Sequence, residues 1–261
     1  MLRPASILLC LSGLTAAAGP LGQAPSAVTA PRKPVAILYF DNYTGNPDYD
    51  PLGKGIASMM ISDLSVVPEI QLVERDHMQD LIKEVDMQHT KYFDSTTAVR
   101  VGHMVGAEFI VVGAFAAAQP QMRIDTRVVR VETGEVMKTA QVVGDQDKFF
   151  DLEQALANKL VDGLGVALSP EEHDRLVAQE NANRVDALAT LVSFSQALAL
   201  YDRGDYVGAV QRMAPAVQAA PNAMFMRVAY DEMKHRAAAA AADKAKDKIN
   251  SGLKGIFKRP P

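Results

Sequence analysis

Cysteine is almost absent from this chain of 261 residues, which contains a single one, Cys10. We expect the N-terminal stretch around Cys10 to be removed, which leaves no thiol for disulfides or for cysteine-based metal sites. The stability of the remaining chain must therefore come from packing. A hydrophobic content of 48% is ordinary for a globular protein, so the chain has enough apolar residues to bury a core.

Recognised patterns of catalytic and metal-binding residues are also missing. The sequence contains no H-E-x-x-H and no G-x-S-x-G, and no thiol nucleophile remains once Cys10 is removed. The five histidines stand outside any such pattern (His77, His89, His103, His173 and His235). The sequence therefore predicts a protein that is not an enzyme, with no catalytic residue, no metal and no cofactor. A net charge of −4 argues against nucleic acid as a general partner.

The N-terminus has the features of a secretory signal peptide. Arg3 provides positive charge, residues 7–18 form a short apolar run, and small residues follow as cleavage sites. A membrane span needs about 20 apolar residues, which is more than this run provides. We predict a signal peptide over residues 1–27 and a linker over residues 28–33.

Residues 34–168 alternate between strand and helix patterns, which is typical of an α/β or α+β domain. The predicted strands cover residues 35–40, 70–75 and 108–118, and a β-hairpin with Gly134 in its turn covers residues 122–145. Apolar residues at helical spacing predict one helix after each of the first two strands. The same spacing predicts two further helices, at 94–106 and at 152–168. This pattern predicts an α/β (α+β) sandwich.

A polar loop after the first predicted strand looks at first like a binding site for a cation or a phosphate. Its carboxylates are Asp41, Asp48 and Asp50, and the glycines Gly53 and Gly55 stand near the start of a helix. The glycine and glutamate that a calcium loop requires are missing from their positions. The spacing matches neither of the common phosphate-binding patterns. We therefore interpret the loop as a polar connection that leads into a helix.

From Ser169 onward the pattern is helical and rich in alanine, and Ser169 and Glu172 are placed as a capping box. Within a predicted helical region over residues 169–246, one stretch resembles a tetratricopeptide repeat, because small residues stand where two helices would cross. The residues of this signature are Ala197, Gly204, Tyr206, Ala209, Met213, Ala216 and Pro221. Only one full unit is visible, so we expect the helices on either side to cap it.

The predicted tail over residues 247–261 places apolar residues among lysines and an arginine. The apolar residues are Ile249, Leu253, Ile256 and Phe257. A basic amphipathic helix can lie on an anionic membrane, so these residues are candidates for peripheral membrane contact. A frayed tail is the alternative, because Gly252 and Gly255 weaken a helix.

Three blocks of residues 34–167 resemble the curli production assembly/transport component (CsgG) family, which includes holdfast-attachment relatives and is similar in fold to the N-terminal domain of TolB. The blocks are VAILYFDNYTGNPDYDPLGKGIASMMISDL, VERDHMQDLIKEVDMQHTKYFDSTTAVRVGHMVGAEFIVVGAF and RVVRVETGEVM, in the order of the family. The resemblance implies a CsgG-type domain in the periplasmic space bounded by the outer membrane. It also implies a homo-oligomer or protein partners in the cell envelope.

The chain departs from the family's secretion channel at the places where that channel carries transmembrane hairpins. A membrane strand needs about 9 to 11 residues, whereas only residues 119–121 and 144–148 are available at these places. The family's lipidated cysteine is also missing, because the bulky Leu9 precedes Cys10. We therefore expect a CsgG-type fold without transmembrane hairpins and without a lipid anchor.

These observations predict a non-enzymatic accessory protein for the secretion or assembly of surface structures such as curli-like fibres, adhesins or holdfast. The tetratricopeptide-like helices would bind a protein segment. The alternative is a regulatory protein-binding module for an envelope enzyme or for flagellar or cell-wall machinery.

The short connections lead to a direct prediction about pore formation. In single-channel recordings across planar bilayers, the purified protein should give no reproducible large conductance, because neither connection can form a membrane hairpin. Reproducible large conductance would overturn this argument.

Overall fold

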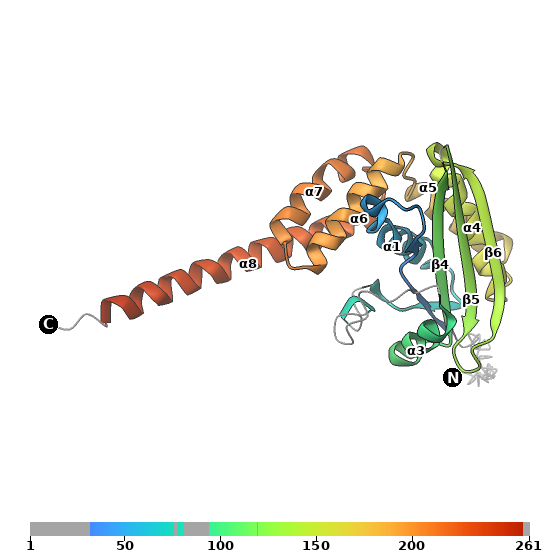
Figure 1. Cartoon of the computed structure of the whole chain (residues 1–261), viewed down its shortest axis with the longest axis horizontal. Helices are drawn as coiled ribbons and strands as arrows, with labels where there is room; N and C mark the ends of the chain where they lie inside the picture. The colour runs from blue at the N-terminus through green and yellow to red at the C-terminus, as the bar shows by residue number, and fades with distance from the viewer. Residues whose placement is uncertain (1–31, 76–77, 81–93, 119, 258–261) are drawn as a thin grey trace, which may run out of the picture. The chain divides into compact units, whose positions relative to one another are not determined.

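The computed structural model describes residues 32–75, 78–80, 94–118 and 120–257, and the side chains of residues 251–257 are outside this description (Figure 1). The chain divides into residues 1–30 and a compact unit from Pro31 to Pro261. The predicted signal peptide therefore lies outside the described residues, as does most of the helix predicted after residue 75.

The described residues contain a mixed sheet of six strands, which confirms the predicted combination of strands and helices. The strands are β1 (Lys33–Ile37), β2 (Asp41–Asn42), β3 (Ile70–Leu72), β4 (Phe109–Ala118), β5 (Gln121–Arg130) and β6 (Val136–Asp145). Their order is β3-β1-β4-β5-β6, and β2 also pairs with β4. Strand β1 pairs in parallel with β3 and β4, and β2 pairs in parallel with β4. Strands β4, β5 and β6 form an antiparallel meander. The first strand is shorter than predicted and ends at Ile37, although the next three residues are also buried.

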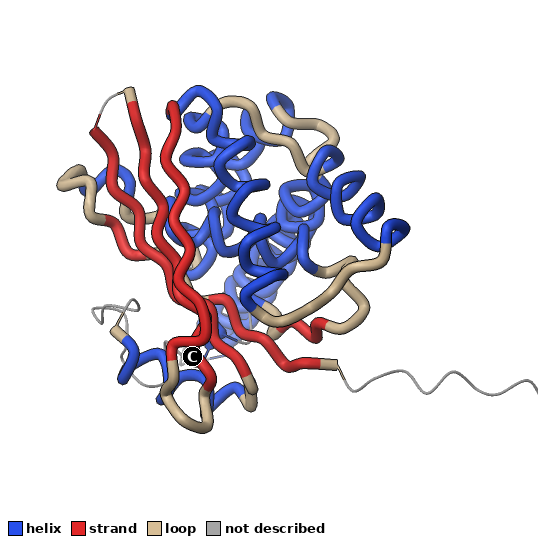
Figure 2. Tube along the Cα trace, turned by 90° about the vertical axis from the view of Figure 1, so that its right-hand side faces the viewer, coloured by secondary structure: helices blue, strands red, loops and turns tan. Residues whose placement is uncertain are grey.

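Helices pack beside this sheet and form the whole C-terminal part of the described chain. They are α1 (Leu52–Leu64), α3 (Ser95–Val105), α4 (Phe149–Gly163), α5 (Pro170–Ala182), α6 (Leu188–Asp202), α7 (Tyr206–Ala219) and α8 (Met224–Phe257), with 3-10 turns at Pro47–Tyr49 and Gln146–Lys148. Most of them lie on one side of the strands (Figure 2). Every helix of the described residues is too short or too polar to cross a membrane.

The capping residues of two helices agree with the sequence. Ser169 and Glu172 form the predicted capping box of α5, in which Glu172 Oε2 accepts from the backbone N–H of Ser169 at 2.8 Å. Asp94 caps α3 by accepting from the backbone N–H of Thr97, and Gly106 ends the helix at a φ of 67°. Because these residues satisfy backbone groups at the helix ends, they define where α3 and α5 begin.

Helix α1 is packed between the sheet and the C-terminal helices, and two glycines allow this close packing. A Cβ atom at Gly53 would lie 2.0 Å from the backbone oxygen of Phe40, and one at Gly55 would lie 2.0 Å from Ser195 Oγ in α6. Residues two positions apart point to nearly opposite sides of a helix. The glycines of the polar loop region therefore serve contacts of α1 on two sides rather than a phosphate.

This contact between α1 and α6 can be tested with a pair of substitutions. Gly55→Ala should lower the free energy of unfolding by about 1 to 2 kcal/mol, because overpacking outweighs the gain in helix propensity. Adding Ser195→Ala should recover most of the loss, since it removes the hydroxyl that the new methyl group meets. Urea unfolding of the two single variants and the double variant measures this coupling. Equal stability of the Gly55→Ala variant and the parent would contradict the close contact.

Candidate functional site

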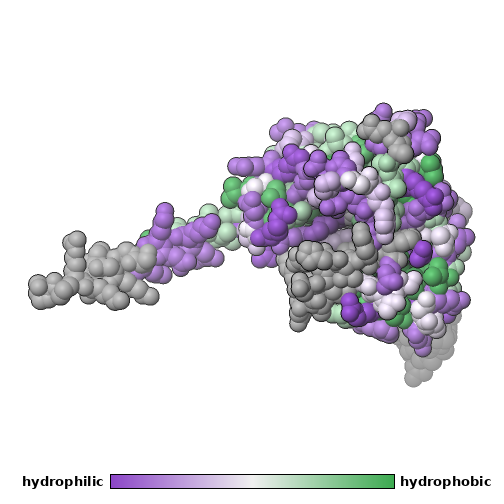
Figure 3. Space-filling view, viewed as in Figure 1, coloured by the Kyte–Doolittle hydropathy of each residue, from purple (hydrophilic) through white to green (hydrophobic). Residues whose placement is uncertain are grey.

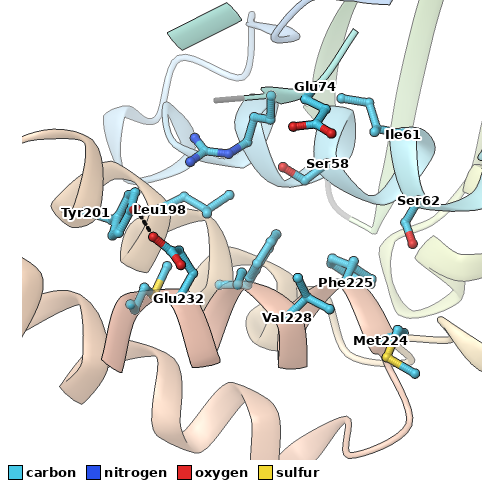
Figure 4. Close-up of a pocket in the computed structure, with 14 residues that line it drawn as sticks. Ser58, Ile61, Ser62, Glu74, Leu198, Tyr201, Met224, Phe225, Val228 and Glu232 are labelled. Atoms are coloured by element: carbon cyan, nitrogen blue, oxygen red, sulfur yellow. Dashed lines mark hydrogen bonds between the residues drawn. The ribbon is translucent and has the colours of Figure 1, made fainter. Parts of the chain in front are cut away.

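The candidate site is an apolar groove of about 470 Å³ that lies beside α1. Its walls come from α1, from the end of β3, from α6 and from the first turns of α8 (Figure 4). The lining residues are Ser58, Ile61, Ser62, Glu74, Arg75, Phe194, Leu198, Tyr201, Met224, Phe225, Val228, Ala229, Glu232 and Met233. Hydrophilic side chains cover much of the face that Figure 3 presents.

The apolar part of the groove is built mainly by α6 and α8. The rings of Phe194 in α6 and Phe225 in α8 meet edge to face at 5.0 Å, and both side chains are buried. Val228 and Met224, also in α8, are 62% and 51% exposed, so they present apolar surface to the solvent. Exposed aliphatic side chains beside a buried aromatic pair can accept apolar groups of a binding partner.

Charged groups lie along the rim of the groove. Glu74 follows β3, and Glu232 in α8 accepts hydrogen bonds from Arg236 Nε at 2.8 Å and from Tyr201 at 3.3 Å (Figure 4). Arg75 donates to both oxygens of Asp202, at 3.0 and 3.2 Å. The rim therefore offers carboxylates on two sides of an apolar floor.

Asp202, at the end of α6, joins three separate parts of the fold. Besides Arg75 it accepts from Lys54 Nζ of α1 at 2.5 Å. Lys54 also donates to Gln79, which accepts a second hydrogen bond from the Tyr39 hydroxyl. Only 5% of the Asp202 side chain is exposed, so the removal of this carboxylate would take away a buried acceptor that two cations share. This cluster holds α6 against α1 next to the groove.

Three buried carboxyl groups meet behind the groove, where α1, α4 and α5 pack together. They belong to Asp63, Glu153 and Glu180, and none of the three residues is exposed to solvent. Burial raises the pKa of Asp63 and raises that of Glu153 well above its usual value, and the charge of Asp63 raises the pKa of Glu153 further. Burial, together with the charge of Asp63, raises the pKa of Glu180 to about 7.

The predicted tetratricopeptide signature falls on two antiparallel helices, α6 and α7. Gly204 takes a φ of 81° in the turn between them, and Tyr206 at the start of α7 packs against Tyr201 at 5.4 Å. The four small or apolar members are buried (Ala197, Ala209, Met213 and Ala216), and Pro221 follows the end of α7. The structure thus brings these residues together in one helix pair, and membership of the tetratricopeptide class stays a prediction.

The predicted tail belongs to the same helix as the groove wall, since α8 runs without interruption from Met224 to Phe257. No side chain from residue 234 to residue 250 is buried. Ile249 is 64% exposed, while the side chains of the other candidates for membrane contact (Leu253, Ile256 and Phe257) lie outside the described residues.

The polar loop is held by its own side chains. Asn42 donates to Asp50 at 2.7 Å and to the backbone oxygen of Asn46, and Asn46 caps the short turn by accepting from the backbone N–H of Asp48. These bonds fit the interpretation of the loop as a polar connection. The structure places the loop outside the groove.

Sequence reasoning missed the groove and the buried carboxyl groups, although a signal for the latter existed. Asp63 follows Ile56 by seven residues and Met59 by four, which puts a carboxyl group on the apolar face of α1. Glu180 follows the buried Leu176 by four residues in the same way. The groove had no such signal, because its walls come from segments that are distant in the sequence.

The mixed sheet with flanking helices and a helical C-terminal part defines an α/β sandwich protein. Residues 15–119 match the family model of the curli production assembly/transport component CsgG. A curated relative, putative adenylate cyclase 3 of Rhizobium meliloti (strain 1021), is 26% identical over 172 residues, which is 64% of this chain. The chain spans only 27% of the length of that protein.

Solved structures with some likeness include the LpoB C-terminal domain from Salmonella enterica, with 11% identity, a TM-score of 0.38 and coverage of 46% of this chain and 88% of that one. Lipoprotein GNA1162 from Neisseria meningitidis has 10% identity, a TM-score of 0.37 and coverage of 52% and 99%. The PelC dodecamer from Paraburkholderia phytofirmans has 13% identity, a TM-score of 0.34 and coverage of 53% and 90%.

The ion-pair cluster at Asp202 leads to a prediction about stability. Asp202→Asn should lower the free energy of unfolding by about 1 to 3 kcal/mol, because a charged acceptor shared by Lys54 and Arg75 is lost. Asp186→Asn is the matched control, since Asp186 pairs with Arg184 at an exposed position and its loss should cost less than about 1 kcal/mol. Chemical denaturation measures both variants, and equal losses would contradict the role of Asp202.

Proposed function

We propose that this protein is a non-enzymatic accessory protein of the cell envelope, and that its apolar groove binds a segment of a partner polypeptide. The proposal rests on which parts of the chain form the walls of the groove. One wall, formed by α1 and the end of β3, belongs to the stretch that matches the CsgG family, and the other comes from the C-terminal helices. A CsgG-family domain is thus joined to a helical region through a surface suited to apolar side chains.

The groove suits a protein segment better than a small polar ligand. Its floor is formed by aromatic and aliphatic side chains, and exposed Val228 and Met224 extend this apolar surface outward. The carboxylate of Glu74 at the rim favours a segment that carries lysine or arginine beside its apolar residues, whereas Glu232 is already paired with Arg236. Such a segment would bury apolar groups in the groove while its cations remain at the solvated rim.

The proposed setting is the periplasm, in the secretion or assembly of surface structures such as curli-like fibres, adhesins or holdfast. This setting rests on the CsgG family of residues 15–119 and on the signal peptide predicted from the sequence. We also propose a homo-oligomer and a peripheral membrane contact through the end of α8. The match to putative adenylate cyclase 3 indicates a shared stretch of sequence. It supports no particular reaction for this chain, because it covers only 27% of that protein.

The alternative function, regulation of an envelope enzyme or of flagellar or cell-wall machinery, would use the same groove. The two functions differ in the partner that occupies it. The identity of the bound protein therefore distinguishes them.

A photo-cross-linking experiment with matched positions tests the proposal. A photoreactive amino acid at Val228, in the groove, should capture a defined envelope protein, whereas one at Val207 should not. Val207 in α7 is 60% exposed, like Val228 at 62%, but it lies outside the groove. Both side chains are exposed, so both variants should fold. Val228→Asp should reduce co-purification of the same protein at least about tenfold, because burial of a carboxylate opposes docking, and Val207→Asp should leave it unchanged.

Mass spectrometry of the captured protein gives the outcome. Components of fibre or adhesin export support the first function, and cell-wall or flagellar enzymes support the alternative. Equal capture at both positions would contradict the groove as the binding site.

A further inference from the structure

The buried carboxyl groups behind the groove have too few hydrogen-bond donors for three separate anions. Asn183 Nδ2 donates to Asp63 Oδ1 at 2.5 Å, and Gln154 Nε2 donates to Glu180 Oε2 at 2.8 Å. Four other carboxyl oxygens of the cluster have no donor: Asp63 Oδ2, Glu153 Oε1, Glu153 Oε2 and Glu180 Oε1. Because Glu153 is fully buried, solvent cannot donate hydrogen bonds to its two oxygens. These oxygens can be paired only if a proton lies between Glu153 and a neighbouring carboxyl group.

The polar and charged groups that face this cluster come from the three helices that supply the carboxyl groups. They are Ser62 and Asp63 of α1, Glu153 and Gln154 of α4, and Gln179, Glu180 and Asn183 of α5 and its end. Among the described residues, no basic side chain donates a hydrogen bond to the three carboxyl groups. Arg184, next to Asn183, pairs with Asp186 and lies over the ring of Phe150 at 4.5 Å. Protons are therefore the positive charges available to the cluster.

Asn183 connects the cluster to the groove. Its side chain donates to Asp63 and, at 2.9 Å, to Ser62 Oγ, and its Oδ1 accepts from the backbone N–H of Met224 at 3.1 Å. Ser62 and Met224 both line the groove, and Met224 is the first residue of α8. The position of Asn183 therefore links the carboxyl groups directly to one wall of the groove.

We propose that Asp63, Glu153 and Glu180 form a proton-held latch that keeps α4 and α5 packed on α1 and fixes the start of α8 at the groove. In the closed latch, protonated carboxyl groups donate O–H bonds to their neighbours. When the protons leave to the solvent, the carboxylates repel one another and the bonds of Asn183 to Asp63 and Met224 weaken. The consequence for binding rests on the proposed function of the groove, whereas the latch itself does not.

The direction of the pH dependence follows from proton linkage. Folding raises the pKa of Glu180 from 4.5 to about 7, so the folded chain binds more protons than the unfolded chain between these values. The stabilisation is therefore complete at acidic pH and is lost as the pH rises through about 7. Between pH 5.5 and 8.5, the folding constant of the parent should fall by at least about tenfold.

Isosteric substitutions test the latch by unfolding measurements at several pH values. The double variant Glu153→Gln with Glu180→Gln should lose less than about twofold in folding constant over the same pH range, because its amides donate at every pH. Glu171→Gln is the matched control, since Glu171 lies exposed in the first turn of α5 and should leave the dependence of the parent unchanged. A parent without pH dependence, or a double variant that keeps it, would overturn the proposal.

A second measurement uses the folded parent, so its result does not depend on whether the carboxyl variants fold. The methyl resonance of Met224 is assigned by its absence from the spectrum of the Met224→Leu variant. It should titrate with a midpoint near the pKa of Glu180, about 7. A Met224 resonance that stays constant between pH 5.5 and 8.5 would overturn the proposal. Neither measurement requires a binding partner, so failure of the latch and failure of the proposed partner binding give different results.

Discussion

Helix α1 packs closely against its neighbours on two sides, and this packing holds the sheet and the C-terminal helices together. Gly53 admits the backbone of Phe40 on one side, and Gly55 admits Ser195 of α6 on the other. The same helix supplies Ser58, Ile61 and Ser62 to the groove. The groove therefore exists only while α1 and α6 remain in contact, and the ion pairs of Asp202 add polar bonds to this contact.

In this arrangement, the stretch that matches the CsgG family model and the helical region both line the groove. The α/β part alone would expose the side of α1 that α6 and α8 cover. The helices alone would lack the wall that α1 and the end of β3 provide. The binding surface that we propose belongs to neither part by itself, because each contributes one side of it. In the function that we propose, partner recognition is thus coupled to the packing of the two parts.

Most of the fold could be predicted from the sequence, because its signals are local. Little of the site could be predicted, because its residues come from distant segments. Helical spacing, the capping box at Ser169 and the glycine in the hairpin turn are local signals, so α4, α5 and the β5–β6 hairpin could be predicted from neighbouring residues. Asp63 on an apolar helix face was a local signal as well, but it gave no information about its partners. Glu153 and Glu180 come from other helices, and only the tertiary packing brings the three together.

The most direct test of partner binding is amide hydrogen exchange of the full chain, measured alone and in complex with the envelope protein captured at the groove. We expect slower exchange in the first turns of α8, from Met224 to Met233, and in α1, with the edge strand β6 unchanged. Protection confined to β6 or to α7, with Met224 to Met233 unaffected, would contradict the groove as the binding site.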